Sequence, residues 1–482
     1  MSFNSIDFAV FLTVVFLLYW SIARNSLFRQ NLLMLVSSYF FYGWWNWRLL
    51  FLIIFISACN YFFGIGISRQ KQEHHRKFLL ILSLLINLGI LGFFKYYNFF
   101  IENLSGLFSI LGNPLNISTL DILLPIGISF YTFQNISYII DVYREEILPE
   151  KNILLFFNFV AFFPKLVTGP IEKPGNMLSQ LNKKQEFNYK LSTDGLRQIL
   201  WGIFKKIVIA DNCAFFVNEI FGSSSYYSGS TLLLGTFLFS IQIYADFSGY
   251  SDIAIGSAKL FSINLMQNFR YPYFSDSVAE FWRRWHISFS NWLRDYLFIP
   301  LQFKYRDLRV WGNVLSLMIT FLLCGLWHGS DWTYIFWGSL HGLYMSFALL
   351  IQDFKKKISG KLLKLGFIGQ AFRIISTFCL ISFAWIFFKV DSLKQGFDYV
   401  NRIFSGSLFS IPQVGPKSDL LKLILLIFFF LILEWFQKDK EYPLQFTNNK
   451  KLRIVRWGIY YFILLLIFSF GGNPVQFIYV QF

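Results

Sequence analysis

Two histidines stand in aromatic surroundings that suit acid–base chemistry. His286 lies in FWRRWHISFSNWLRDY (281–296), and His328 lies in GLWHGSDWTYIFWGSLHG (325–342). A neutral imidazole is the side chain best matched to general-base catalysis near pH 7. The apolar run before His328 ends at WHGSDW, so a break near Gly329 would turn this imidazole toward a cavity rather than lipid. We therefore expect His328 to be a general base.

The stretch around His286 has helical periodicity. On a single helix, His286 shares one face with aromatic side chains, and polar side chains occupy the other face. The aromatic face holds Trp282, Trp285, Phe289 and Trp292, and the polar face holds Arg284, Ser288, Asn291 and Asp295. From this pattern alone, His286 is either a buried residue packed among the tryptophans or a functional residue, and the two alternatives stay open.

Other chemical signatures near these histidines are weaker. Cys324 precedes His328 by four residues and could pair with it as a thiolate, but cysteine is an ordinary buried hydrophobe in such segments. His328 and His341 would lie about 20 Å apart on one continuous helix. The chain contains neither HExxH nor GxSxG, so we expect no metal site and no nucleophile elbow. Asp331 is a candidate to orient His328.

The composition is that of a membrane protein. The chain has 482 residues, of which 55% are hydrophobic and 15% are charged, against about 25% charged residues in soluble proteins. Six segments are nearly free of charge and approach the ~20 residues that a spanning helix needs. They are residues 8–22, 49–67, 78–94, 372–388, 421–435 and 457–470. We predict an all-α polytopic integral membrane protein.

Less uniform apolar segments raise the expected number of crossings to roughly ten to twelve. They are residues 32–45, 123–140, 153–167, 196–210, 231–244, 253–261, 314–327 and 332–351. Some are too short to span, and we expect these to be re-entrant or interfacial helices surrounded by protein or a wet cavity. The chain shows no useful repeat and no long linker, which predicts a single membrane domain over residues 1–482 with its signature region at 242–342.

The charged residues indicate which loops face the cytoplasm and which side chains hold helices together. The net charge is +16, but the basic residues flank apolar segments and form no visible nucleic-acid-binding module. The basic residues in the loops at 24–29 and 68–77 place both loops in the cytoplasm by the positive-inside rule. Asp246 and Asp252 interrupt an apolar stretch, and we expect them to lock helices by hydrogen bonds. The four cysteines show no CxxC spacing, which predicts free thiols.

Sequence blocks along nearly the whole chain resemble one family. FWRRWHISFSNWLRDYLFIPL (281–301) and GLWHGSDWTYIFWGSLHG (325–342) resemble the signature of the membrane-bound O-acyltransferase family, in its bacterial branch. Supporting blocks are FYGWWNW (41–47), FFKYYNFF (93–100), LLPIGISFYTFQNISYIIDVYR (123–144), FFPKLVTGPIEKP (162–174), GIFKKIVIADN (202–212) and FIYVQF (477–482). Members of this branch acetylate alginate, cellulose, cell-wall glycan or other exported polysaccharides, and more distant ones transfer D-alanine to teichoic acid.

The resemblance implies a multi-pass enzyme of the bacterial inner membrane. It implies about eleven transmembrane helices around a thinned centre, where a cytoplasmic funnel and an extracytoplasmic opening meet near the catalytic histidine. His328 matches the family's near-universal histidine, and His286 matches its second, more variable one. Because the resemblance places His286 against the central cavity, we interpret it as a residue that positions a carbonyl or pantetheine group of the acyl donor, with packing among the tryptophans as the alternative. Asp331 stands where relatives usually carry a small or neutral residue, so its orienting role is not one that the family implies.

The residues and the resemblance together predict acyl transfer across the membrane. Acetyl-CoA enters from the cytoplasm as the acyl thioester donor, no cofactor is held, and His328 takes the proton from a hydroxyl of an extracytoplasmic polysaccharide. Arg283, Arg284, Arg294 and Lys304 could contact the phosphates of CoA, with snorkelling to lipid headgroups as an equal alternative. Expected partners are membrane lipids and a periplasmic SGNH-type acetyltransferase, and nucleic acid is not one.

Three other functions remain open at this point. One is transfer of another acyl group, such as D-alanine, from a carrier protein. Another is a glycan or lipid transporter, which should show corresponding broken segments in two halves, whereas the chain shows no such internal symmetry. The last is a non-catalytic scaffold for polysaccharide export, which the intact WHG and WRRWH blocks disfavour.

Overall fold

The computed structural model describes residues 1–113, 117–167, 169–351, 366–446, 453–471 and 475–478. Within these ranges the regular structure is helical, and no residue forms a strand. Six helical stretches of the described chain are long and apolar enough to cross a membrane, which confirms the all-α polytopic class. They are Leu27–Arg69, Glu73–Ile110, Gly229–Leu260, Val310–His328, Gly366–Lys389 and Arg453–Phe470. The higher number of crossings expected from the sequence stays a prediction.

The chain divides by its internal contacts into two compact units. The first comprises Met1–Leu196 and Ala254–Met266, and the second comprises Arg197–Ile253 and Gln267–Phe482. Two helices, α10 (Tyr189–Phe204) and α12 (Gly229–Leu260), contribute residues to both units. Each unit is therefore built from stretches that are not contiguous in the sequence.

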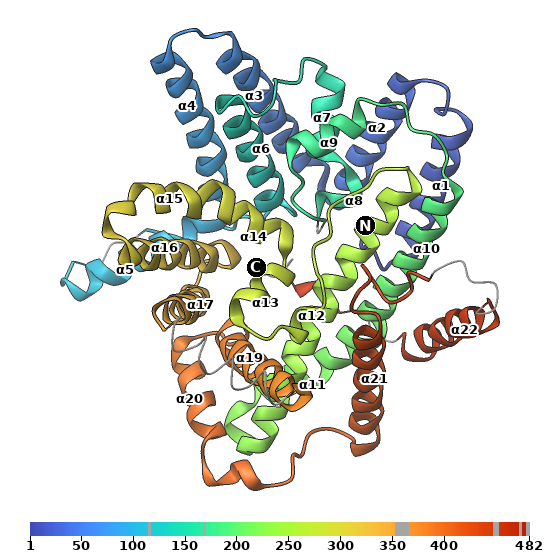
Figure 1. Ribbon diagram of the computed structural model, residues 1–482. Coiled ribbons are helices and arrows are strands. Elements are labelled where there is room, and N and C mark those ends of the chain that lie inside the picture. Colours follow the sequence, from blue (N-terminus) through green and yellow to red (C-terminus); the bar gives the residue numbers. More distant parts are fainter. Residues whose placement is uncertain (114–116, 168, 352–365, 447–452, 472–474, 479–482) are drawn as a thin grey trace. The chain divides into compact units, whose positions relative to one another are not determined.

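The first unit gathers the N-terminal helices (Figure 1). They are α1 (Ile6–Ser21), α2 (Leu27–Asn46), α3 (Leu50–Arg69), α4 (Glu73–Leu91), α5 (Tyr97–Ile110), α6 (Ile128–Tyr143), α7 (Ile153–Ala161), α8 (Phe163–Leu166) and α9 (Pro174–Leu181). Helices α3, α4 and α6 pack against one another. Asn60 of α3 accepts from Ser83 and Asn87 of α4 at 3.0 and 2.9 Å, an interhelical polar cluster of the kind that joins helices in an apolar medium.

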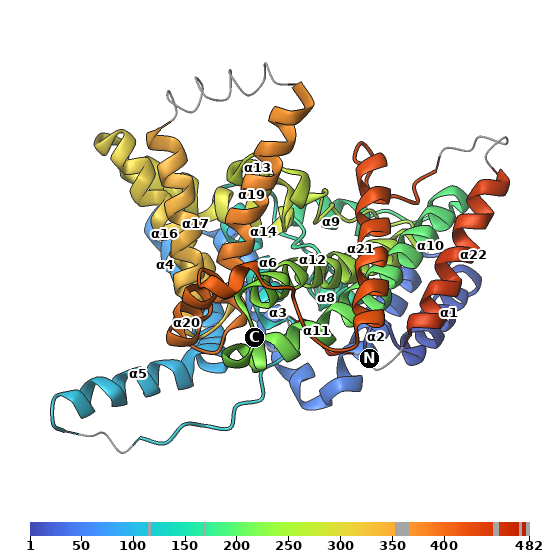
Figure 2. The same ribbon diagram turned by 90° about the horizontal axis from the view of Figure 1, so that it is seen from below.

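The second unit carries both candidate histidines. Its helices are η3 (Lys205–Ala210), α11 (Asp211–Gly222), α13 (Val278–Arg284), α14 (Ile287–Leu293), η6 (Arg294–Phe298), α15 (Ile299–Lys304), α16 (Val310–His328), α17 (Trp332–Leu350), α19 (Gly366–Lys389), α20 (Leu393–Ile403), α21 (Lys417–Phe436) and α22 (Arg453–Phe470). Helices α16 and α17 run side by side and follow each other directly in the chain (Figure 2). Residues 479–482 of the terminal block FIYVQF, and Thr168 of the block at 162–174, lie outside the described residues.

Glycines allow the close approach of α16 and α17. A Cβ on Gly338 of α17 would lie 2.3 Å from the carbonyl oxygen of Phe321 in α16, and a Cβ on Gly325 of α16 would lie 2.3 Å from the carbonyl oxygen of Tyr334. Small residues at such crossings let helix backbones meet in a lipid environment. Because α16 ends at His328, this contact also sets where the histidine stands.

Gly338→Ala is expected to destabilise the protein. The added methyl group meets backbone of α16, which cannot move aside alone, and overpacking of this kind costs about 1–3 kcal/mol. The measurement is the free energy of unfolding in detergent micelles. Gly458→Ala in α22 is the matched control, because a Cβ there meets no atom within 4 Å. Equal stability of the two variants would contradict the proposed close contact.

Candidate active site

The chain around His286 is broken rather than continuous. Helix α13 ends at Arg284, α14 begins at Ile287, and His286 between them has φ 43° and ψ 53°, in the left-handed region. Histidine is among the non-glycine residues that enter this region most readily, and such conformations cluster at functional sites. The expected single helix over residues 281–296 is therefore wrong, because it would place every residue of the stretch in the right-handed conformation.

A neighbouring stretch of chain holds this break in place. The backbone N–H of Arg270 donates to the carbonyl of Arg284 at 2.9 Å, and the backbone N–H of Ile287 donates to the carbonyl of Asn268 at 2.8 Å. The side-chain oxygen of Asn268 accepts from the hydroxyl of Ser288 at 2.9 Å. The sequence analysis did not single out Asn268, because only its pairing with the 284–288 stretch gives it a role.

His286 is enclosed by aromatic rings. Its side chain is fully buried, and its ring centroid lies 4.7 Å from Phe247, 5.1 Å from Phe289 and 5.9 Å from Trp327. It lies between two seven-residue helices, outside the segments long enough to span a membrane. Burial lowers the pKa of His286 to about 3, so the imidazole is neutral at physiological pH.

His328 is the last residue of α16, where the chain breaks as expected. Gly329 follows in an extended conformation with φ −160°, and α17 begins at Trp332. The backbone needs glycine here, because a Cβ on Gly329 would lie 2.1 Å from the ring of Tyr334. The His328 side chain is buried, with Trp337 at 4.9 Å between ring centroids. The predicted turn after His328 is thus confirmed.

The two histidines border the same pair of rings. Phe289 and Trp327 stack with centroids 4.0 Å apart and planes 26° apart. The imidazole of His286 lies beside both rings, and so does that of His328, at 5.9 Å from Phe289 and 4.6 Å from Trp327. The fold therefore brings together two buried imidazoles that are far apart in the sequence, beside the same aromatic rings.

His341 is a third buried histidine of this unit. The indole N–H of Trp282 donates to its Nδ1 at 3.2 Å, so in neutral His341 the proton is on Nε2. His328 and His341 both lie beside Trp337, at 4.9 and 4.8 Å between ring centroids. Their expected separation of about 20 Å applied to one continuous helix. The two histidines do not lie on one continuous helix, because the chain turns at Gly329 and α17 packs back along α16.

Two other residues near His328 have structural contacts. Asp331 caps α17, where its carboxylate accepts from the backbone N–H of Thr333 at 2.8 Å. The orienting role that we expected for Asp331 toward His328 stays a prediction. Cys324 is buried in α16, and all four cysteines are free thiols as predicted.

The four candidate donor-binding cations lie on short helical segments that follow one another. Arg283 and Arg284 end α13, Arg294 begins η6, and Lys304 ends α15. Arg283 and Lys304 are exposed. Arg284 pairs with Glu280 at 2.5 Å, and Arg294 pairs with the following residue at 2.8 Å. These contacts leave both readings open, phosphate binding and contact with lipid headgroups.

Asp252 and Asp246 hold buried lysines, which confirms their expected locking role. Lys205 of η3 lies 2.6 Å from Asp252 of α12 and donates to Ser248 at 2.8 Å. Gln198 of α10 donates to the other carboxylate oxygen of Asp252 at 2.8 Å. The sequence analysis missed the two lysines as partners, although the KK pair within the apolar block 202–212 is an unusual signal for buried charge.

The second lysine ties the C-terminal stretch to the same region. The ammonium of Lys206 lies 2.8 Å from Asp211 and 2.9 Å from Asp246, and it donates to the carbonyl of Val475 at 2.9 Å. Asp246 also accepts from the backbone N–H of Ile478 at 2.9 Å. Phe477 between them packs against the aromatic residues of α12. Charge pairing in the core therefore places residues 475–478 beside Phe247, the ring that contacts His286.

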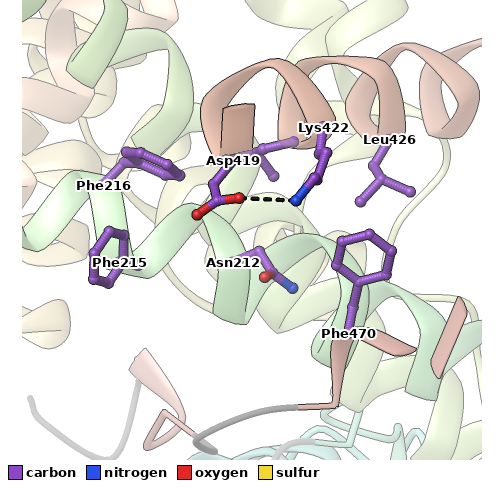
Figure 3. A pocket seen from close by; sticks show the side chains of 8 residues that line it. Asn212, Phe215, Phe216, Asp419, Lys422, Leu426 and Phe470 are labelled. Atoms are coloured by element: carbon purple, nitrogen blue, oxygen red, sulfur yellow. Dashed lines mark hydrogen bonds and ion pairs between the residues drawn. The ribbon is translucent and has the colours of Figure 1, made fainter. Parts of the chain in front are cut away.

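The second unit also has a groove that is separate from the histidine site. It is lined by Asn212, Phe215, Phe216, Asp419, Lys422, Leu423, Leu426 and Phe470, from α11, α21 and α22 (Figure 3). An exposed ion pair at 3.0 Å joins Asp419 and Lys422 in it. The rings around His286 and His328 come from other helices, so this groove is not part of the histidine site.

The fold and the site define a multi-pass helical membrane protein with a buried pair of histidines. Residues 144–389 match the model of the membrane-bound O-acyltransferase (MBOAT) family, and the chain belongs to this family. The protein is therefore a membrane O-acyltransferase, which sets aside the transporter and the scaffold.

Bacterial relatives span most of the chain. The probable alginate O-acetylase AlgI of Pseudomonas aeruginosa is 35% identical over 424 residues, which cover 86% of this chain and 78% of that protein. The peptidoglycan O-acetyltransferase of Helicobacter pylori is 36% identical over 415 residues, covering 80% and 76%. The teichoic acid D-alanyltransferase of Bacillus subtilis is 30% identical over 250 residues, covering 48% and 60%.

Lys206→Met is expected to lower the free energy of unfolding by about 3–5 kcal/mol, because it leaves two buried carboxylates without their counter-charge. The measurement is denaturant unfolding of the purified protein in micelles. Lys422→Met is the matched control, since its ion pair with Asp419 is exposed and contributes about 1 kcal/mol or less. Similar losses in both variants would show that the Lys206 cluster is not a stabilising core.

Proposed function

We propose that the protein transfers an acetyl group from cytoplasmic acetyl-CoA to a hydroxyl of an exported polysaccharide, directly or through an extracytoplasmic partner, with His328 as general base. The observation that carries this proposal is the pair of buried imidazoles beside Phe289 and Trp327. Relatives named for O-acetylation of alginate and of peptidoglycan, similar over most of the chain, support the acetyl group and the polysaccharide.

The proposed reaction is a single acyl transfer. The acceptor hydroxyl donates its proton to a ring nitrogen of His328 as its oxygen attacks the thioester carbonyl. The new C–O bond forms and the C–S bond breaks. The proton on His328 passes to the leaving thiolate, and the products are an O-acetyl ester and free CoA thiol. His328 ends in its starting neutral form, ready for another cycle.

The aromatic enclosure suits this chemistry. A buried site keeps water from competing with the acceptor hydroxyl for the thioester, and it strengthens the electrostatic interactions that act on the developing charge. The rings of Trp337 and Phe388 flank His328 and restrict its rotation. A base held in line with its substrate lowers the entropic part of the barrier.

The donor's phosphates have candidate partners on α13, η6 and α15. The guanidinium groups of Arg283, Arg284 and Arg294 suit bidentate contact with phosphate, and Lys304 adds a point charge. Arg283 and Lys304 are exposed and so can meet a soluble donor from the aqueous side. A periplasmic SGNH-type acetyltransferase that receives the acetyl group is also part of the proposal.

Transfer of D-alanine from a carrier protein is the second candidate. The similarity to the teichoic acid D-alanyltransferase of Bacillus subtilis supports it, over 48% of this chain. Purified protein in nanodiscs, given labelled acetyl-CoA or a D-alanyl carrier protein together with alginate oligomers, separates the two. We expect acetyl-CoA to be consumed and acetyl ester to appear; transfer from the carrier protein alone would overturn the proposed donor.

His328→Ala is expected to lower kcat by about 10²–10⁴-fold, the usual contribution of a general base. The change removes no spanning surface, so the protein should stay in the membrane and remain folded. The measurement is acetyl ester formation by variant protein that elutes as wild type does. His75→Ala, at an exposed position of α4, is the control and should retain full activity. Activity of folded His328→Ala above roughly a tenth of wild type would exclude the base role.

Neutralising Arg283 and Arg284 together, by Arg→Gln at each, is expected to raise the KM for acetyl-CoA much more than it lowers kcat, because phosphate contacts contribute equally to ground state and transition state. Steady-state kinetics with varied acetyl-CoA measure this. Arg306→Gln, at an exposed arginine outside the candidate set, is the control. An unchanged KM combined with reduced protein yield would favour contact with lipid headgroups instead.

A further inference from the structure

We infer that Asn268 is a positioning residue that fixes the tautomer of His286, so that His286 presents the lone pair of Nε2 to a hydrogen-bond donor of the substrates. This inference rests on the proposed function, because it gives His286 its part in that reaction. It also adds a residue that neither the sequence pattern nor the family signature singled out.

The orientation of the Asn268 amide follows from its neighbours. The backbone N–H of Ser288 lies 3.3 Å from one side-chain atom of Asn268, and a backbone N–H can only donate. That atom is therefore the oxygen, which also accepts from the Ser288 hydroxyl at 2.9 Å. The hydrogen-bond network thus excludes the flipped amide.

The same oxygen decides which nitrogen of His286 carries the proton. Nδ1 of His286 lies 3.2 Å from Oδ1 of Asn268. An amide oxygen has no hydrogen to give, so Nδ1–H must donate to it. In a neutral imidazole only one nitrogen is protonated, and Nε2 is then left with a lone pair.

The neutral form is favoured by the surroundings of His286. Its ring contacts are with Phe247, Phe269, Phe289 and Trp327, all of them uncharged. Both Asn268 and His286 are fully buried, which disfavours an imidazolium. His341 has the opposite tautomer, because its Nδ1 accepts from Trp282. His286 and His341 therefore have opposite tautomers.

This tautomer restricts what His286 can do to the substrates. Nε2 can accept a hydrogen bond from the acceptor hydroxyl or from an amide N–H of the pantetheine arm. It cannot donate to the thioester carbonyl, because its only proton is on Nδ1 and is used by Asn268. The sequence analysis allowed His286 to contact either a carbonyl or the pantetheine group of the acyl donor. This tautomer excludes the contact with the carbonyl and keeps the contact with the pantetheine group.

The side chain of Asn268 can be changed without removing the backbone bonds of the turn. The bonds Ile287 N–H to Asn268 C=O and Arg270 N–H to Arg284 C=O involve only backbone atoms. Asn268→Asp keeps an acceptor of the same shape toward Nδ1–H, and Asn268→Leu removes it at similar volume. Ser288→Ala is the matched control, since it removes a bond to the same oxygen but leaves the acceptor for His286.

The first measurement is the ¹⁵N spectrum of histidine-labelled protein in nanodiscs, with the His286 signals assigned by their loss in His286→Gln. We expect protonated Nδ1 and unprotonated Nε2 in the wild type, in Asn268→Asp and in Ser288→Ala. We expect a mixture of tautomers or Nε2–H in Asn268→Leu. His341, with its proton on Nε2, is the internal reference. A wild-type His286 signal in Asn268→Leu would overturn the inference.

The second measurement is kinetic. We expect Asn268→Leu to lower kcat/KM by roughly ten- to a hundredfold, and Asn268→Asp to restore most of it. A raised KM for acetyl-CoA identifies the pantetheine amide as the group that His286 binds, and a raised KM for alginate oligomers identifies the hydroxyl. Equal losses in Asn268→Asp and Asn268→Leu would show a packing role only and overturn the inference.

The two measurements separate this inference from the proposed function. If the wild-type protein does not use acetyl-CoA, the proposed function fails, but the ¹⁵N spectra still test the tautomer. If the protein is active and Asn268→Leu keeps both its tautomer and its kcat/KM, the proposed function stands and the inference fails.

Discussion

The site depends on a pair of backbone hydrogen bonds between the stretch at 268–270 and the stretch at 284–287. They hold His286 in a left-handed conformation that interrupts what would otherwise be one aromatic helix. A continuous helix would carry His286 and Ser288 on different faces. The break instead lets both residues meet the side chain of Asn268, and it sets the imidazole beside Phe289 and Trp327.

Burial explains why the lysines and aspartates of this region are paired with one another. An unpaired charge in an apolar interior costs several kcal/mol, and the lysines of η3 accordingly lie against aspartates of α11 and α12. Lys206 also donates to the carbonyl of Val475, so the ion pairs that stabilise the core hold Val475 in place as well. The same physical requirement thus determines both stability and the surroundings of the histidine site.

The sequence predicted some parts of the site well, where the signal was local. The turn after His328 follows from glycine at 329, because only a residue without Cβ fits against Tyr334. The buried aspartates were expected to lock helices, and they do. The helix over 281–296 was predicted wrongly, because hydrophobic periodicity contains no information about the two hydrogen bonds that the stretch at 268–270 makes to it. The capping role of Asp331 at the start of α17 is a further contact that the sequence analysis did not predict.

The class of the protein follows from the sequence alone, since long apolar segments, sparse charge and the two histidine blocks are properties of local composition and spacing. That the two histidines lie beside the same pair of rings follows from the fold, because these rings come from separate helices. The tautomer of His286 likewise follows from the fold and not from the local sequence. A proton's place on an imidazole depends on the atom opposite it, and that atom is supplied by Asn268, which is not a helical neighbour of His286.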